Sequence, residues 1–166
     1  MKREYGTMAA DDLMLDQHHI EAALGENVRI QPTKRPSAVG SVGSLLGSTA
    51  VSTAFRSFAG TLHGEGSELP IAVGSLALVF DSESKAGVTF DHVAQAAHLR
   101  TRIGECLVAV ETTTGANGLV SYWGYVSLRS SILVLTLDAL DPQALSMSDF
   151  RTLVTLAAEH LEAEAA

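Results

Sequence analysis

The chain has 166 residues, of which 46% are hydrophobic and 18% charged, a composition that fits one folded domain and not a disordered polymer. Its formal net charge is -8 with 11 Lys and Arg, too few cations to bind a nucleic acid or an anionic membrane surface. The longest apolar run, within residues 69–80, is too short to cross a bilayer as a helix, and no secretory hydrophobic region follows Met1.

The N-terminal part is predicted to begin with a helix over residues 8–24. Apolar side chains recur there at helical spacing, and Gly25 supplies the stop that helices favour. The apolar positions are Leu13, Ile20 and Leu24. A short strand is expected over 27–31, and Pro32 and Pro36 then end regular structure.

Residues 37–67 are rich in Gly, Ser and small apolar side chains. This composition predicts an irregular, flexible segment that carries one helical turn over 49–58. The glycines do not form a phosphate-binding loop, because such a loop needs a lysine and none lies between Arg35 and Lys85. The segment is interpreted as a linker or a binding loop.

The second half of the chain carries clearer signals. The pattern predicts a strand over 69–81 and a helix over 90–103 with Thr89 as its N-cap. Turn signals at 114–118 and 129–130 leave no room for a crossover helix, so the strands around them must pair antiparallel. These strands are expected over 105–113, 119–128 and 131–138.

The last element has the strongest local signals. Pro142 breaks the chain, and Ser146 with Asp149 three residues later resembles a capping box at the start of a helix. One apolar stripe follows, which predicts that this helix packs on the sheet. Its members are Phe150, Val154, Ala157 and Leu161.

The elements together predict the α+β class: an antiparallel sheet with helices packed on it, an α/β sandwich. Their order is α-(β)-loop-β-α-β-β-β-α. A polar lead over 1–7 precedes one domain over 8–166.

A histidine pair is the most tempting candidate for metal binding. His18 and His19 lie near Asp16 and Glu21, but the pairs spaced three apart point in different directions on a helix. No HExxH motif is present. The cluster is therefore interpreted as an exposed polar helix face, and no metal site is predicted.

Signatures of covalent catalysis are also missing from the sequence. Ser41 and Ser44 lie among glycines, but neither completes the Gly-x-Ser-x-Gly motif. Cys106 is the only cysteine, so no intrachain disulfide can form, and it is predicted to be a buried thiol. The chain is expected to use no cofactor and not to be an enzyme.

Aromatic side chains make up only 5% of the chain, and three of them bunch together. Strand alternation puts Trp123 and Tyr125 on one face and Tyr122 on the other. They either pack across strands in the core or form the wall of a ligand or partner site. Phe55 and His63, from the Gly-rich segment, complete the set of candidate binding residues, because long irregular stretches are often functional.

Several stretches share a pattern of leucines, a gap, an apolar helix ending at glycine, and later a strand, Ser/Asp and a second helix. They are residues 12–25, 76–82, the arginine-turn hairpin at 125–134 and the closing helix to His160-Leu161. This pattern resembles sensor-like domains that lie outside the membrane in bacteria. Such domains occur as the extracellular part of receptor Ser/Thr kinases and as related envelope lipoproteins.

The resemblance implies a non-catalytic ligand-binding or sensor-like domain of the cell envelope, although such domains often carry paired cysteines and this chain has one. Its partner would be a small molecule or another protein, in a possible homo- or hetero-oligomer. An accessory or assembly subunit of a larger complex is the alternative, and a hydrolase a third. The resemblance indicates an extracytoplasmic location, whereas the lack of a signal peptide indicates a cytoplasmic one.

Overall fold

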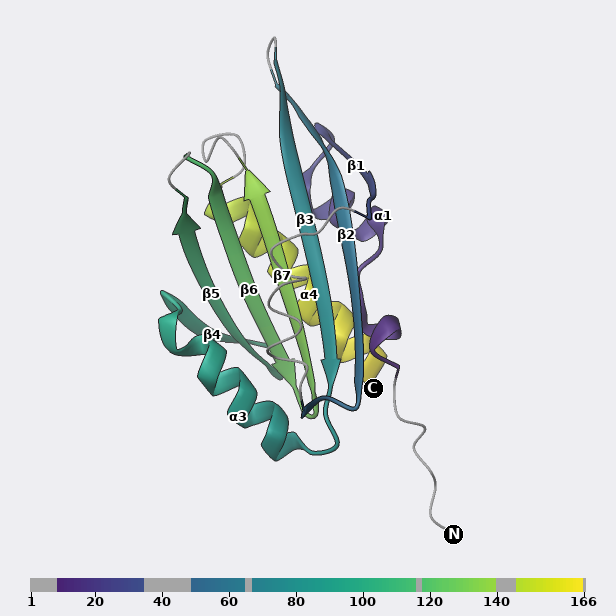
Figure 1. The fold of residues 1–166 in the computed structure, drawn as a ribbon, viewed down its shortest axis with the longest axis vertical. Helices are drawn as coiled ribbons and strands as arrows, with labels where there is room; N and C mark the ends of the chain where they lie inside the picture. The colour runs from purple at the N-terminus through teal and green to yellow at the C-terminus, as the bar shows by residue number, and fades with distance from the viewer. Residues whose placement is uncertain (1–8, 35–48, 65–66, 116–117, 140–145, 166) are drawn as a thin grey trace.

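The computed structural model describes residues 9–34, 49–64, 67–115, 118–139 and 146–165. They form a seven-stranded sheet in the order β1-β2-β3-β7-β6-β5-β4, with helices on both faces (Figure 1). The strands are β1 (Val28–Pro32), β2 (Ser52–Gly64), β3 (Ser67–Val79), β4 (Leu99–Ile103), β5 (Cys106–Thr114), β6 (Val120–Leu128) and β7 (Ser131–Ala139). The helices are α1 (Gln17–Leu24), α3 (Glu83–Val93) and α4 (Met147–Ala165), with the short 3-10 helices η1 (Ala10–Leu13) and η3 (Ala94–Ala96).

All six neighbouring strand pairs are antiparallel, so the predicted α+β class is confirmed. The three consecutive antiparallel strands predicted within 105–137 are β5, β6 and β7. Their turns lie where the sequence placed them: Gly115 N donates to Leu119 O at 2.8 Å, and Arg129 adopts a φ of 54° between β6 and β7. Local turn chemistry therefore determines this half of the sheet.

The sheet has two covered faces, and strand alternation decides which side chains each receives. One face, which we call the α4 face, is covered by α1, α4 and η1 and holds the larger apolar core. The other face, the α3 face, is covered by α3 (Figure 1). The smaller core on the α3 face includes Phe80 and Phe90. In the part of the chain that the structure describes, no helix is both long and apolar enough to cross a membrane.

The C-terminal helix begins as its sequence predicts. Asp149 N donates to Ser146 Oγ at 3.4 Å, and Asp149 Oδ2 accepts from Ser146 N at 2.8 Å. These reciprocal bonds satisfy backbone donors that the first helical turn cannot pair. The predicted stripe is buried throughout: Phe150, Val154, Ala157 and Leu161.

Ser146→Ala is expected to lower the free energy of unfolding by about 1 kcal/mol, because the helix loses its capping oxygen. Urea denaturation of the two proteins measures the difference. A matched Ser148→Ala change, at an exposed position in the first turn of the same helix, removes a hydroxyl without removing the cap. Equal losses from the two substitutions would contradict the capping role.

The expected helix over 8–24 is wrong in its first half. Met14, at the end of η1, is extended with ψ 145°, and α1 begins only at Gln17. Asp16 caps this helix by accepting a hydrogen bond from His19 N at 2.9 Å. The continuous run of buried apolar side chains before Asp16 had hidden the break. As predicted, Gly25 ends the helix, with φ 103°.

The expected helix over 90–103 is also wrong. The helix, α3, spans 83–93, and Ser82 rather than Thr89 is its N-cap, accepting from Lys85 N at 3.2 Å. Residues 99–103 form β4, which pairs with β5 through a turn at Gly104, where φ is 57°. The Ser82 N-cap outweighs the low helix propensity of Gly87, which lies in the second turn of α3.

The expected irregular segment over 37–67 is wrong for residues 52–64, which form β2, and no helical turn spans 49–58. β2 pairs with β3 along its whole length. The small residues of β2 suggest a loop. In the structure, Ala54, Phe58 and Leu62 lie on one face of the strand and pack in the α4-face core. The polar lead at 1–7 and the predictions made for 35–48, 65–66, 116–117 and 140–145 lie outside the described residues.

Candidate functional site

Tyr122 lies in the core and not on a surface. Its side chain is 4% exposed on the α4 face, where its ring stacks on Phe150 with centroids 5.6 Å apart. Burial, and then the negative charge of Asp149, raise the pKa of the phenol. The ring therefore helps to dock α4.

Tyr125 and Trp123 lie on the opposite, α3 face, as strand alternation predicted. Tyr125 is buried, and its hydroxyl donates to Glu111 Oε1 at 3.1 Å. Burial first, and then the Glu111 carboxylate, raise the pKa of Tyr125. Trp123 is half-buried and packs against the smaller core.

Phe55 shares the α3 face with Tyr125 but does not meet it. The strand register runs from Phe55 across β3 and β7 to Tyr125, three strand spacings or about 14 Å away. His63 lies eight residues further along β2, about 26 Å from Phe55, with Nδ1 3.3 Å from Glu68 Oε1. The five candidate residues thus do not converge on one site.

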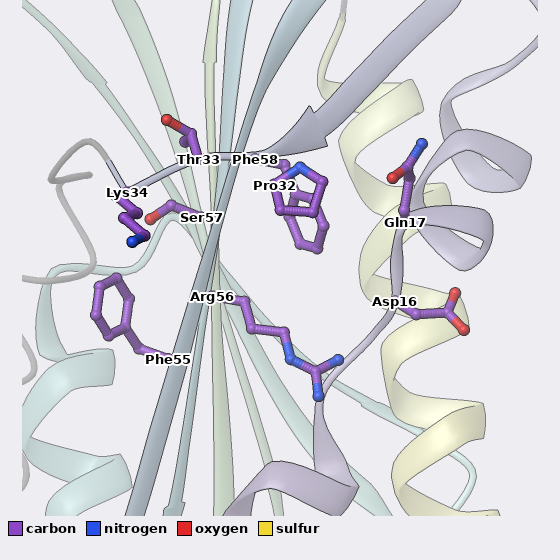
Figure 2. A pocket seen from close by; sticks show the side chains of 9 residues that line it. All are labelled: Asp16, Gln17, Pro32, Thr33, Lys34, Phe55, Arg56, Ser57 and Phe58. Carbon is purple, nitrogen blue, oxygen red and sulfur yellow. The ribbon is translucent and has the colours of Figure 1, made fainter.

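A groove of about 630 Å³ lies at the edge of the sheet beside one of them, and we call it the edge groove (Figure 2). Its walls come from residues 16–17 before and at the start of α1, residues 32–34 at the end of β1, and residues 55–58 of β2. Phe55, 52% exposed, is the only predicted candidate among them. The other walls come from segments far apart in the chain, so sequence spacing gave no signal for them.

The edge groove exists because β1 is much shorter than β2. β1 pairs only with residues 58–62, and Thr33 N then donates the last bond, to Ser57 O at 2.9 Å. Beyond that point, Thr53 and Phe55 turn their N–H and C=O groups away from β3. Within the described residues no backbone group pairs with them. The groove therefore runs along an open strand edge.

Charges in and around the groove are mostly neutralised. Arg56 Nη2 lies 3.0 Å from Asp11 Oδ1. The Asp16 carboxylate caps α1, and the hydrogen bond from the His19 backbone is the main reason that its pKa is lowered. Lys34 is exposed and has no ionic partner among the described residues. A ligand would therefore meet one uncompensated positive charge beside an apolar ring.

Other parts of the described structure offer less. Hollows of about 500 Å³ and 270 Å³ flank α4, the first beside α1 and the second beside β4. No group of three or more metal-ligating side chains forms among the described residues. Burial raises the pKa of Cys106 to about 11, and the carboxylates of Glu162 and Glu105 add to the shift, so the thiol stays protonated at neutral pH.

No protein-family model matches the sequence, and a comparison with curated proteins finds no match. The fold is similar to the crystal structure of the extracellular domain of PknH from Mycobacterium tuberculosis, a receptor Ser/Thr kinase. The two share 10% sequence identity with a TM-score of 0.54, over 92% of this chain and 95% of that one. The resemblance inferred from the sequence is therefore confirmed at the level of the fold: this chain folds like the extracellular domain of a receptor Ser/Thr kinase.

Proposed function

We propose that the chain is a non-catalytic ligand-binding or sensor-like domain of the bacterial cell envelope, and that the edge groove is its binding site. The fold likeness to an extracellular kinase domain supports the class of domain. The site itself is argued from this chain alone, because a shared fold does not carry a function with it.

One observation carries the assignment of the site. Phe55 is 52% exposed inside the groove, next to a lysine that has no ionic partner among the described residues and beside an open backbone edge. Ligand sites typically combine an apolar lining with a few polar groups that fix orientation. Phe58 and Pro32 supply further apolar lining, and Lys34 with the edge of β2 supplies the polar groups.

An accessory or assembly subunit of a larger complex is the second candidate. Val51, just before the start of β2, is a second large apolar side chain that is exposed, at 55%. A protein partner that covered this surface would bury at least about 1,000 Å² in total. A small ligand would stay within the groove.

Phe55→Ser is expected to weaken ligand binding about tenfold, because aromatic anchors in a binding site contribute more than about 1 kcal/mol each. The ligands would be found by screening small-molecule fragments and linear peptides against the ¹⁵N-labelled protein by NMR. Binding should shift the amide signals of residues 33–34 and 55–57 most.

Val88→Ser is the matched control, since Val88 is 68% exposed on α3 and does not line the groove. It should leave the affinity unchanged within about twofold, and both variants should unfold within about 0.5 kcal/mol of the wild type. Ligands whose signals cluster on another surface, and which bind Phe55→Ser normally, would refute the proposed site.

A further inference from the structure

We propose that the edge groove binds an extended peptide segment of a partner protein, which pairs with β2 as an additional strand of the sheet. This inference rests on the proposed function, because it names the ligand class for the same groove. It is carried by the position of the groove along an open strand edge, where main-chain hydrogen bonds can provide affinity.

The backbone of β2 is arranged to accept a strand. Ser57 O accepts from Thr33 N, and His63 N donates to Asn27 O, so odd-numbered residues of β2 direct their backbone groups toward β1. The same alternation applies to Thr53 and Phe55, which lie beyond the end of β1. Together they present two donors and two acceptors, spaced as a β-ladder requires.

Side chains line both sides of this edge. Figure 2 shows Phe55 and Lys34 on one side of the β2 ribbon, and Phe58 and Arg56 on the other. Alternate side chains of an added strand would point to these two sides in turn. A groove that straddles a strand edge fits a peptide, whose side chains alternate, better than a compact ligand that would occupy one side.

The open edge also has two defined ends. Ala10 N donates to Ser52 Oγ at 3.2 Å at one end, and the bond between Thr33 and Ser57 closes the other. The five residue steps between them span about 17 Å of strand. That length fits one short extended segment and offers few bonds to a pairing between two folded sheets.

Charge indicates the kind of peptide. Lys34 lies on the same side as Phe55 and has no ionic partner in the described structure, whereas Arg56 on the other side is already paired with Asp11. The segment should therefore direct an apolar side chain onto Phe55 and an acidic one toward Lys34. A second copy of this chain would bring another Lys34 to the same place, so a peptide from a different protein fits better.

The probe is a library of short linear peptides displayed on phage, selected on the full chain, with the best sequences then synthesised. On saturation, amide hydrogen exchange at Thr53 and Phe55 should slow at least about tenfold, because these donors become hydrogen-bonded. Thr53→Pro removes one donor on the open edge and spares the bonds to β3, so it should weaken binding about tenfold. Val88→Ser, on the exposed surface of α3 and away from the groove, is the control and should bind within about twofold of the wild type.

If Thr53→Pro does not fold, N-methylation of alternate peptide amides tests the same hydrogen bonds from the ligand. Only one of the two alternating sets of amides faces β2, and methylation of that set should weaken binding about tenfold. Peptides that bind without slowing exchange at Thr53 and Phe55 overturn the proposal. Slow exchange at Thr53 and Phe55 in the free protein also overturns the proposal. If that slow exchange depends on protein concentration, a second copy of the chain occupies the edge. If small-molecule fragments shift the amide signal of Phe55 and no peptide is selected, the ligand is not a peptide, and the groove remains the proposed site. If neither class perturbs residues 33–34 and 55–57, the proposed function itself fails.

Discussion

Phe150→Ala should lower the free energy of unfolding by about 3–5 kcal/mol, the range for removing a fully buried aromatic ring. Phe150 is 0% exposed and stacks on Tyr122, so its loss would leave a cavity between α4 and the sheet. The site cannot collapse easily, because Gly124 of β6 already brings the strand close: a Cβ there would lie 3.1 Å from Phe150 Cζ. Urea denaturation followed by the fluorescence of Trp123, the only tryptophan, measures the change.

Phe55→Ala provides the matched control for this result. It removes the same ring from a position that is 52% exposed, so the free energy of unfolding should change by no more than about 0.5 kcal/mol. An unchanged midpoint for Phe150→Ala would mean that α4 does not pack on the sheet through this face.

Gly60→Ala is expected to destabilise the protein by about 1–3 kcal/mol, the usual cost of forcing extra atoms into a packed structure. A Cβ on Gly60 would overlap the carbonyl oxygen of Arg29 and lie 2.7 Å from Cα of Ile30. Both obstacles belong to the β1 backbone, which cannot swing aside as a flexible side chain could. The pairing of β1 with β2 should loosen, and amide exchange in β1 should quicken.

Gly87→Ala is the control of opposite sign. Gly87 lies inside α3, and a Cβ there meets no atom within 4 Å. Alanine should therefore stabilise the helix by about 0.5–1 kcal/mol. A Gly60→Ala protein as stable as the wild type would show that β1 lies farther from β2 than the structure places it.

The sequence predicted best those elements whose signals are local. The β5–β6–β7 meander followed from two turns, and the start of α4 followed from Ser146 and Asp149. Both depend on residues within a few positions of one another, where backbone chemistry decides the outcome. The opposite faces of Tyr122 and Tyr125 followed from the two-residue period of a strand.

The errors arose where tertiary pairing overrides local preference. β2 contains Gly60 and many small residues, and its ladders with β1 and β3 make it a strand. Residues 99–103 alternate Leu, Arg, Thr, Arg and Ile, which is a strand pattern and not the end of the predicted helix. Recognising Ser82 as an N-cap would have moved that helix to its true position and freed β4.

The candidate site could be predicted only in part for the same reason. Phe55 was singled out as an aromatic residue in a Gly-rich stretch, and it does lie exposed in a groove. Lys34 and Gln17 line the same groove only because β1 stops short and α1 packs at the same edge. No local pattern encodes the difference in length between β1 and β2, and that difference creates the groove.

The strand order has a consequence for how the chain reaches its native state. β4 to β7 are joined by short turns, so each new strand closes only a small loop, whereas β3 and β7 pair residues 71–79 with 131–139 across everything in between. Closing that large loop costs more chain entropy and contributes most to the contact order. The meander should therefore form early, with the β3–β7 seam completed after the rate-limiting barrier. A native-like φ-value in the transition state at Leu76 of β3, which pairs with β7, would reverse this order.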